Sequence, residues 1–122
     1  DARTRALEAL KAIRYGDNDY VFVSDMQVRS VMHPIKPELD GKDLSNLRDP
    51  NGIALFAEFA KTVRADGAGF VSYAWPKPGH TAPVAKLSYV KGFEPWGWIV
   101  GSGIYLDDMH AATRTAILRT LG

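Results

Sequence analysis

The order of hydrophobic and polar residues along the chain predicts alternating helical and extended segments. Near the N-terminus, Ala6, Leu10 and Ile13 recur at the spacing of one helical face. Residues 20–24 are a run of aromatic and β-branched side chains, which is typical of a strand. The elements predicted in this way are, in chain order, a helix over 2–14, strands over 20–24 and 28–33, a helix from 49 to about 65, strands over 70–75, 84–90 and 98–105, and a final helix that begins near 107.

A proline-rich and acidic segment separates the predicted hairpin from the middle helix. Residues 34–51 contain three prolines and four acidic side chains, and loops of this length in compact domains are often functional. At its end, Asp49 and Pro50 resemble an N-cap followed by a proline in the first helical turn. The helix is then predicted to bury Phe56 and Phe59. Together the predicted elements describe an α+β domain with one antiparallel sheet and helices packed on it.

Composition narrows the functional classes. The 122 residues are 46% hydrophobic and 24% charged, which fits one globular domain over residues 1–122 with a single core. Fifteen Lys and Arg against fourteen Asp and Glu give a formal net charge of +1, which argues against bulk electrostatic binding of nucleic acid. The chain has no cysteine, so disulfides, thiolate metal sites and cysteine nucleophiles are excluded. The longest uncharged stretch, 95–106, is far shorter than the roughly 20 apolar residues of a membrane-spanning helix.

The sequence lacks the motifs of common enzymes and cofactor sites. The Gly-Ser-Gly run at 101–103 is not a nucleophile elbow, and the Gly-Lys pair at 41–42 lacks the other residues of a phosphate-binding loop. His33, His80 and His110 are too far apart for zinc-type spacing. We therefore expect no catalysis, no metal and no bound cofactor.

A set of motifs distributed over most of the chain carries a family resemblance. They are Tyr20-Val-Phe-Val-Ser-Asp; His33-Pro34 with Leu39, Gly41 and Asp43; Asp49 with Asn51-Gly52; the run from Gly69 to Gly79; the run from Lys86 to Val90; Trp96-Gly97-Trp98; and the run from Gly101 to Asp108. Each motif is weak alone, but their order and spacing resemble the type 2 single Cache domain of bacterial chemoreceptors and sensor kinases. The resemblance covers about Tyr15 to Met109.

The resemblance implies a PAS-like antiparallel sheet of about five strands, flanked by N-terminal, middle and C-terminal helices. It also implies a periplasmic domain of an inner-membrane receptor, attached to the membrane only through flanking segments, that binds a small organic acid. The expected receptor is a methyl-accepting chemotaxis protein that senses acetate, propionate or pyruvate, forms a homodimer and signals through its terminal helices. The N-terminal helix of such domains is longer than the segment before Tyr15, so we expect it to be truncated here. A ligand-free interaction or dimerisation module of a sensor kinase is the alternative.

Lys86 is the residue that departs most from its surroundings. Strand alternation places Val84, Lys86 and Ser88 on one face and Ala85 and Leu87 on the other. A lysine on a half-buried face is costly to desolvate without an anion. The sequence alone leaves open a solvated lysine on an edge strand, whereas the family resemblance implies that Lys86 is the charge partner of a ligand carboxylate.

The other predicted ligand-binding residues supply hydrogen-bond donors and apolar walls. They are His33, Tyr73, Trp75, Tyr20, Phe22 and Met32. His33 can charge near neutral pH, which predicts a pH-dependent affinity. Ordinary core packing is the alternative role for the aromatic residues and for Met32, and an ordering role in the following loop is the alternative for His33. Tyr89 and Tyr105 are predicted to lie in the core.

Overall fold

The computed structural model describes residues 1–108, in which short helices and strands alternate. In chain order the elements are α1 (Ala2–Lys11), β1 (Arg14–Tyr15), β2 (Asp19–Asp25), β3 (Ser30–Met32), η1 (Pro37–Leu39), α2 (Leu55–Asp66), β4 (Ala68–Pro76), β5 (Pro83–Phe93), η2 (Glu94–Trp96) and β6 (Trp98–Tyr105). The predicted C-terminal helix lies outside the described residues, apart from residues 106–108, which are helical.

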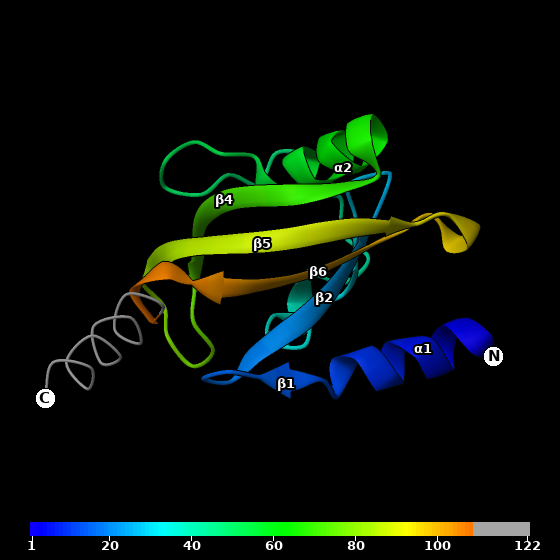
Figure 1. Ribbon diagram of the computed structural model, residues 1–122, viewed down its shortest axis with the longest axis horizontal. Helices are drawn as coiled ribbons and strands as arrows, with labels where there is room; N and C mark the ends of the chain where they lie inside the picture. The colour runs from blue at the N-terminus through cyan, green and yellow to red at the C-terminus, as the bar shows by residue number, and fades with distance from the viewer. Residues whose placement is uncertain (109–122) are drawn as a thin grey trace, which may run out of the picture.

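Within this part of the chain, the strands form one antiparallel sheet in the order β1-β2-β6-β5-β4, and β3 pairs with β2 beside this path (Figure 1). The predicted hairpin is confirmed as β2 and β3, and the three later strands are confirmed as β4, β5 and β6. The α+β class with a single antiparallel sheet is therefore confirmed. β5 and β6 occupy the middle of the sheet, so each is hydrogen-bonded along both edges.

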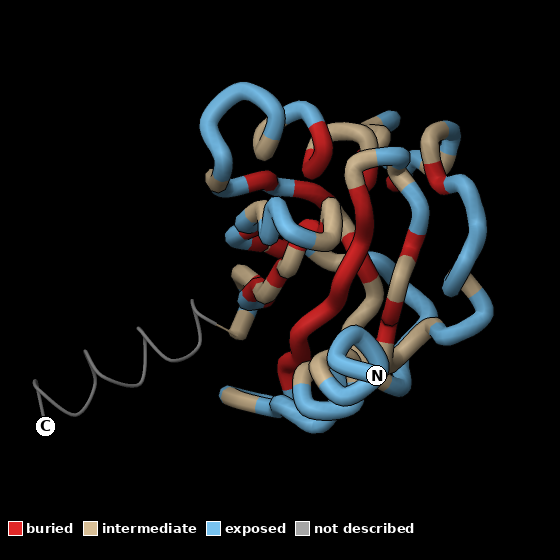
Figure 2. The backbone as a smooth tube through the Cα atoms, turned by 90° about the vertical axis from the view of Figure 1, so that its right-hand side faces the viewer, coloured by how far each residue is buried: buried red, intermediate tan, exposed pale blue. Residues whose placement is uncertain are grey.

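Helix α2 covers one face of the sheet and closes the main core (Figure 1). Its Phe56 and Phe59 are buried as predicted, and it ends at Gly67, whose φ of 77° is a left-handed conformation that suits glycine. Strand alternation supplies the other side of this core, because inward residues of β4 such as Tyr73 are buried while Phe70 is 69% exposed. β2 is buried along its whole length and forms a long stretch of buried chain in Figure 2.

Helix α1 packs on the opposite face of the sheet, near one end of β2. Ala6, Leu7 and Leu10 contact a second core cluster, which contains Val23, Met32 and Trp98. The helix is shorter than predicted: it ends at Lys11, Ile13 is 44% exposed, and the short strand β1 follows, which the sequence pattern did not predict. None of the helices in residues 1–108 combines the length and the apolar character needed to cross a lipid bilayer.

Asp49 does not cap the middle helix as predicted. α2 begins only at Leu55, and no side chain caps it. Oδ1 of Asp49 instead accepts hydrogen bonds from the amides of Asn51 (3.0 Å) and Ile53 (2.9 Å), and Oδ2 accepts one from the amide of Ala74 in β4 (2.8 Å). The two loop amides and the Ala74 amide, which is on the edge strand of the sheet, are thus all satisfied by the buried carboxylate, which ties the loop before α2 to the sheet.

Candidate ligand-binding site

Lys86 is a buried lysine in the middle of the sheet. The strand register places it between Tyr73 of β4 and Tyr105 of β6, and strand alternation turns it toward the face that α2 covers. Its side chain is largely enclosed, with only 2% of the residue exposed. The alternative of a solvated lysine on an edge strand is therefore wrong, because β5 has a neighbour along each edge.

The Lys86 ammonium contacts one hydroxyl and three aromatic rings. Nζ donates a hydrogen bond to the Tyr20 hydroxyl (3.1 Å) and lies 4.2 Å from the centroid of the Tyr20 ring. The ring centroids of Phe22 and Tyr105 are 5.3 and 5.1 Å from Nζ. No carboxylate among residues 1–108 forms an ion pair with it. Burial lowers the pKa of Lys86 to about 7, and the more distant charge of Asp19 partly opposes this shift.

His33 presents a hydrogen-bond donor to the same cluster. Its Nδ1 accepts hydrogen bonds from the amides of Ile35 (3.3 Å) and Lys36 (3.0 Å), so the proton of the neutral ring is on Nε2. The ring lies 5.0 Å from the Tyr20 ring and 5.7 Å from the Trp75 ring. Nε2 has no hydrogen-bond partner in the described part of the chain, which leaves it free to bind a ligand oxygen.

His33 is neutral at physiological pH, contrary to the expectation that it titrates near neutrality. Burial, reinforced by the positive charges of Lys86 and Lys36, lowers the pKa of His33 to about 3. Its backbone is positioned by Asp40, whose Oδ1 accepts hydrogen bonds from the His33 amide (2.9 Å) and the Ser30 hydroxyl (3.0 Å). Asp40 was not predicted as a site-forming residue, because an acid in a polar loop gives no signal of the amide that it will bind.

Trp75 and Tyr73 differ in what they can offer a ligand. The Trp75 indole Nε1 is buried and has no hydrogen-bond partner within residues 1–108, so it is a second free donor. The Tyr73 hydroxyl is already hydrogen-bonded to Ser88 Oγ (2.7 Å). Tyr73 therefore contributes a wall of the cluster, whereas Trp75 contributes both a wall and an N–H group.

The structure brings Lys86, Tyr20, Phe22, His33, Tyr73 and Trp75 together and places Met32 elsewhere. Met32 pairs with Val23 and belongs to the cluster on the α1 side of the sheet, since the path of β3 turns its side chain away from Lys86. Tyr105 is buried as predicted and adds an unpredicted contact with Lys86. Tyr89 is not a core residue, because it is 42% exposed on the outer face.

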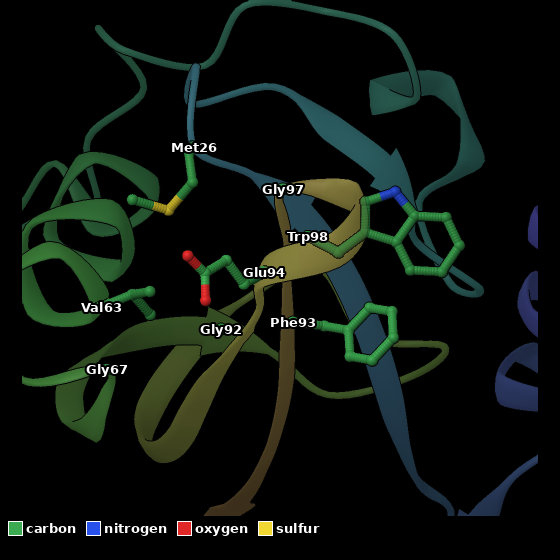
Figure 3. A pocket seen from close by; sticks show the side chains of 8 residues that line it. All are labelled: Met26, Val63, Gly67, Gly92, Phe93, Glu94, Gly97 and Trp98. Atoms are coloured by element: carbon green, nitrogen blue, oxygen red, sulfur yellow. The ribbon is translucent and has the colours of Figure 1, made fainter.

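A groove at the other end of β5 is chemically unsuited to an anion. It has a volume of about 380 Å³ and is lined by Met26, Val63, Gly67, Gly92, Phe93, Glu94, Gly97 and Trp98. Figure 3 shows the Glu94 carboxylate projecting between Met26 and Val63, and no lysine or arginine lines the groove. Phe93 is seven residues along the strand from Lys86, or roughly 23 Å. The groove is therefore separate from the Lys86 cluster.

Comparison with known proteins shows the class to which the chain belongs. Residues 1–122 match a family model described as Cache domain, so the chain belongs to the Cache domain family. The methyl-accepting chemotaxis protein McpP of Pseudomonas putida is 49% identical over 110 residues, which are 90% of this chain and 20% of McpP. The chain thus spans about a fifth of the length of this relative.

Solved structures agree with this assignment. A periplasmic sensor domain of a chemotaxis protein is 60% identical and superposes with a TM-score of 0.84, covering 85% of this chain and 72% of that chain. A Cache chemosensory domain whose structure describes carboxylic acid recognition is 49% identical, with a TM-score of 0.84 and coverage of 85% and 71%. The PAS domain of Bordetella pertussis BvgS, at 15% identity and a TM-score of 0.53, shares the fold alone and covers 99% of this chain and 98% of its own. The chain is a periplasmic sensor domain with a PAS-like fold.

Proposed function

We propose that this domain is the ligand-binding sensor of a transmembrane chemoreceptor, a methyl-accepting chemotaxis protein, and that its ligand is a monocarboxylate of two or three carbons. Acetate, propionate and pyruvate are the candidate ligands. The observation that carries the proposal is the ammonium of Lys86, which is buried in the middle of the sheet without an acidic partner among residues 1–108. A buried cation is costly unless it is paired, and a ligand carboxylate supplies the missing charge.

The neighbouring donors match the second oxygen of a carboxylate. In the proposed complex one oxygen binds Lys86 Nζ, and the other accepts a hydrogen bond from His33 Nε2 or from Trp75 Nε1. Charge-assisted hydrogen bonds of this kind are about twice as strong as neutral ones. Because His33 is neutral, Lys86 is the one fully buried cation that faces the cluster within residues 1–108, which favours a monocarboxylate over a dicarboxylate. Lys36 is half-buried at the edge of the cluster, with its Nζ 5.5 Å from the centroid of the Trp75 ring.

The aromatic enclosure favours a short ligand. The rings of Tyr20, Phe22 and His33 pack against one another, and the Trp75 ring packs against His33, so the enclosure leaves little room for an apolar tail. A ligand the size of acetate has four heavy atoms, and at a ceiling of about 1.5 kcal/mol per atom its binding free energy is limited to about 6 kcal/mol. The corresponding dissociation constant is on the order of tens of micromolar, which suits a sensor that must release its ligand as the concentration falls.

A thermal-shift and calorimetric titration tests the proposal. The domain is unfolded, washed free of co-purified ligand and refolded, and then titrated with acetate, propionate, pyruvate, butyrate and succinate. One or two of the short monocarboxylates should stabilise the wild type by about 2.7 kcal/mol at a hundred times the dissociation constant. The stabilisation should be absent in Lys86→Met.

Lys91→Met is the matched control, because Lys91 is on the same strand but exposed. It should bind the same acids as the wild type. If a correctly folded, ligand-free domain responds to none of these acids, the carboxylate proposal is rejected. That result would favour the ligand-free interaction module, which predicts dimer formation without any small molecule.

A further inference from the structure

Tyr15 lies outside the proposed ligand site and connects the segment after α1 with β6. Its hydroxyl donates a hydrogen bond to the carbonyl oxygen of Gly103 (2.6 Å) and accepts one from the amide of the same residue (2.8 Å). The carbonyl oxygen of Tyr20 is 3.4 Å from this hydroxyl. A single side chain from β1 thus reaches the main chains of both β2 and β6.

The hydroxyl fills a gap where two strands separate. β2 and β6 are paired from Asp25 and Trp98 as far as Val21 and Ser102, and the pairing stops before Tyr20 and Gly103. Figure 1 shows the two strands diverging toward β1. Gly103 is buried, so its amide and carbonyl would lose their partners in the gap without Tyr15. Leaving such groups unpaired is costly, which gives the phenol hydroxyl a defined place in the sheet.

Both sides of this gap lie against Lys86. Gly103 packs closely on β5, because a Cβ atom at position 103 would come within 2.7 Å of the Leu87 carbonyl oxygen, within 2.9 Å of the Lys86 Cε atom and closer still to Ser88 Oγ. On the other side of the gap, the Tyr20 hydroxyl accepts the hydrogen bond of the Lys86 ammonium. The two residues held by Tyr15 are therefore the same residues that flank the Lys86 side chain.

We propose that the Tyr15 hydroxyl is a positioning group for the carboxylate site: it sets the width of the gap between β2 and β6, and thereby holds Tyr20 against Lys86 and keeps water away from the ammonium. The ligand part of this inference rests on the proposed function. Tyr15 follows the end of α1 by four residues, so the same hydroxyl links the site to the N-terminal helix. A merely structural tyrosine would affect stability without affecting the environment of Lys86.

The titration of Lys86 is a readout of that environment. The ionisable groups that face Lys86 or act on its charge are Tyr20, Tyr73, Tyr105, His33 and Asp19. Burial raises the pKa of Tyr105 to about 12 and also raises the pKa values of Tyr20 and Tyr73, while His33 stays neutral with a pKa of about 3. Burial raises the Asp19 pKa above its ordinary value, and the positive charge of Lys86, which does not contact Asp19, opposes this shift. A Lys86 titration can therefore be compared between variants that leave these groups unchanged.

The test uses Tyr15→Phe, with Tyr89→Phe as the matched control, because the Tyr89 hydroxyl is on the exposed face and makes no hydrogen bond within the described residues. In the ligand-free domain, NMR of ¹³C-labelled lysine side chains follows the Lys86 titration. Water entering the gap in Tyr15→Phe should move the Lys86 midpoint upward, toward that of an ordinary lysine. At pH 6, where Lys86 is charged in both proteins, acetate should bind roughly tenfold more weakly to this variant, because water in the gap screens the ammonium and competes with the ligand for it. Tyr89→Phe should match the wild type in both measurements.

An unchanged Lys86 midpoint in a folded Tyr15→Phe domain overturns the inference, whatever happens to acetate binding. If the wild type binds no acetate, propionate or pyruvate, the proposed function fails, and the lysine titration still decides the role of Tyr15. If Tyr15→Phe does not fold, hydrogen exchange in the wild type decides. A Gly103 amide that exchanges slowly supports the bond to Tyr15, and one that exchanges as fast as an open loop overturns it.

Discussion

Lys86 and His33 are both buried bases, yet burial leaves them in different states at neutral pH. The pKa of His33 falls to about 3, so its ring is a permanently neutral donor. Burial also lowers the pKa of Lys86, but only to about 7, because the pKa of an ordinary lysine is near 10.4 and so much higher than that of a histidine. Lys86 is therefore the group in this cluster whose charge changes near neutral pH.

The affinity for a monocarboxylate should consequently fall as pH rises. Below about pH 7 the ammonium form predominates and the dissociation constant should be nearly constant down to pH 6. Above pH 7 the Lys86 amine is mostly neutral and must take up a proton when the carboxylate binds, so the affinity should weaken by up to about tenfold per pH unit. Titration calorimetry with acetate between pH 6 and 9, in buffers of different ionisation enthalpy, measures both effects. A several-fold gain in affinity as pH falls from 7 to 6 would contradict this assignment, because it would indicate that His33 takes up a proton in that range.

At the scale of elements, the Asp49 carboxylate supplies hydrogen bonds to the irregular segment before α2, which has no regular secondary structure of its own. Asp49 accepts hydrogen bonds from two loop amides and from the amide of Ala74 in β4, the strand that carries Tyr73 and Trp75. Burial by itself would raise the pKa of Asp49, but the hydrogen bonds from Ala74, Ile53 and Asn51 outweigh it and lower the pKa. The loop and the ligand-facing strand are thus held by the same side chain.

Asp49→Ala should destabilise the domain by about 2 kcal/mol, because it leaves the half-buried amides of Ile53 and Ala74 unpaired. Chemical denaturation at pH 7 measures the change. The pKa of Asp49 is lower in the folded domain than in the unfolded chain, so the ionised carboxylate stabilises the fold above the unfolded-state pKa of about 4. This stabilisation is lost as pH falls below that value. The difference in stability between variant and wild type should therefore shrink in acid. Asp43→Ala is the control, since Asp43 is an exposed loop residue whose carboxylate accepts a hydrogen bond from the nearby Ser45 amide. Equal losses in the two variants would argue against a special role for Asp49.

At the scale of the whole molecule, the site reduces stability in return for binding. A cation in the middle of a sheet is costly in the free protein, and a bound anion removes that cost. The folded-state pKa of Lys86 lies below the value of about 10.4 expected for an unfolded chain, so the folded domain binds fewer protons between these pH values. The loss of folding stability caused by the buried ammonium is therefore largest below pH 7, and it decreases as pH rises toward about 10.

Lys86→Met should accordingly make the ligand-free domain more stable at pH 7, by about 1–4 kcal/mol. The gain should decrease as pH approaches 10, because the wild type then buries a neutral amine. Urea denaturation at pH 6, 7, 8 and 9.5 measures both quantities. Lys91→Met provides the comparison for loss of an exposed positive charge and should show no such pH dependence. A Lys86→Met domain that is less stable than the wild type at pH 7 would show that the lysine is already compensated.

The sequence by itself determined most of the elements, the residues that share a strand face, and the family; it missed β1 and the start of α2. Period-two alternation is a local property, so it correctly placed Tyr73 and Trp75 on one strand face and Lys86 on the same face as Ser88. The order of motifs correctly identified a periplasmic Cache domain with a PAS-like fold. Only the tertiary structure decided what these side chains meet. The contact of Tyr105 with Lys86, the neutral state of His33, the loop role of Asp49 and the reach of Tyr15 to Gly103 depend on strand register and loop path. Register and loop path are set by contacts between segments far apart in the chain, which no local pattern of residues encodes.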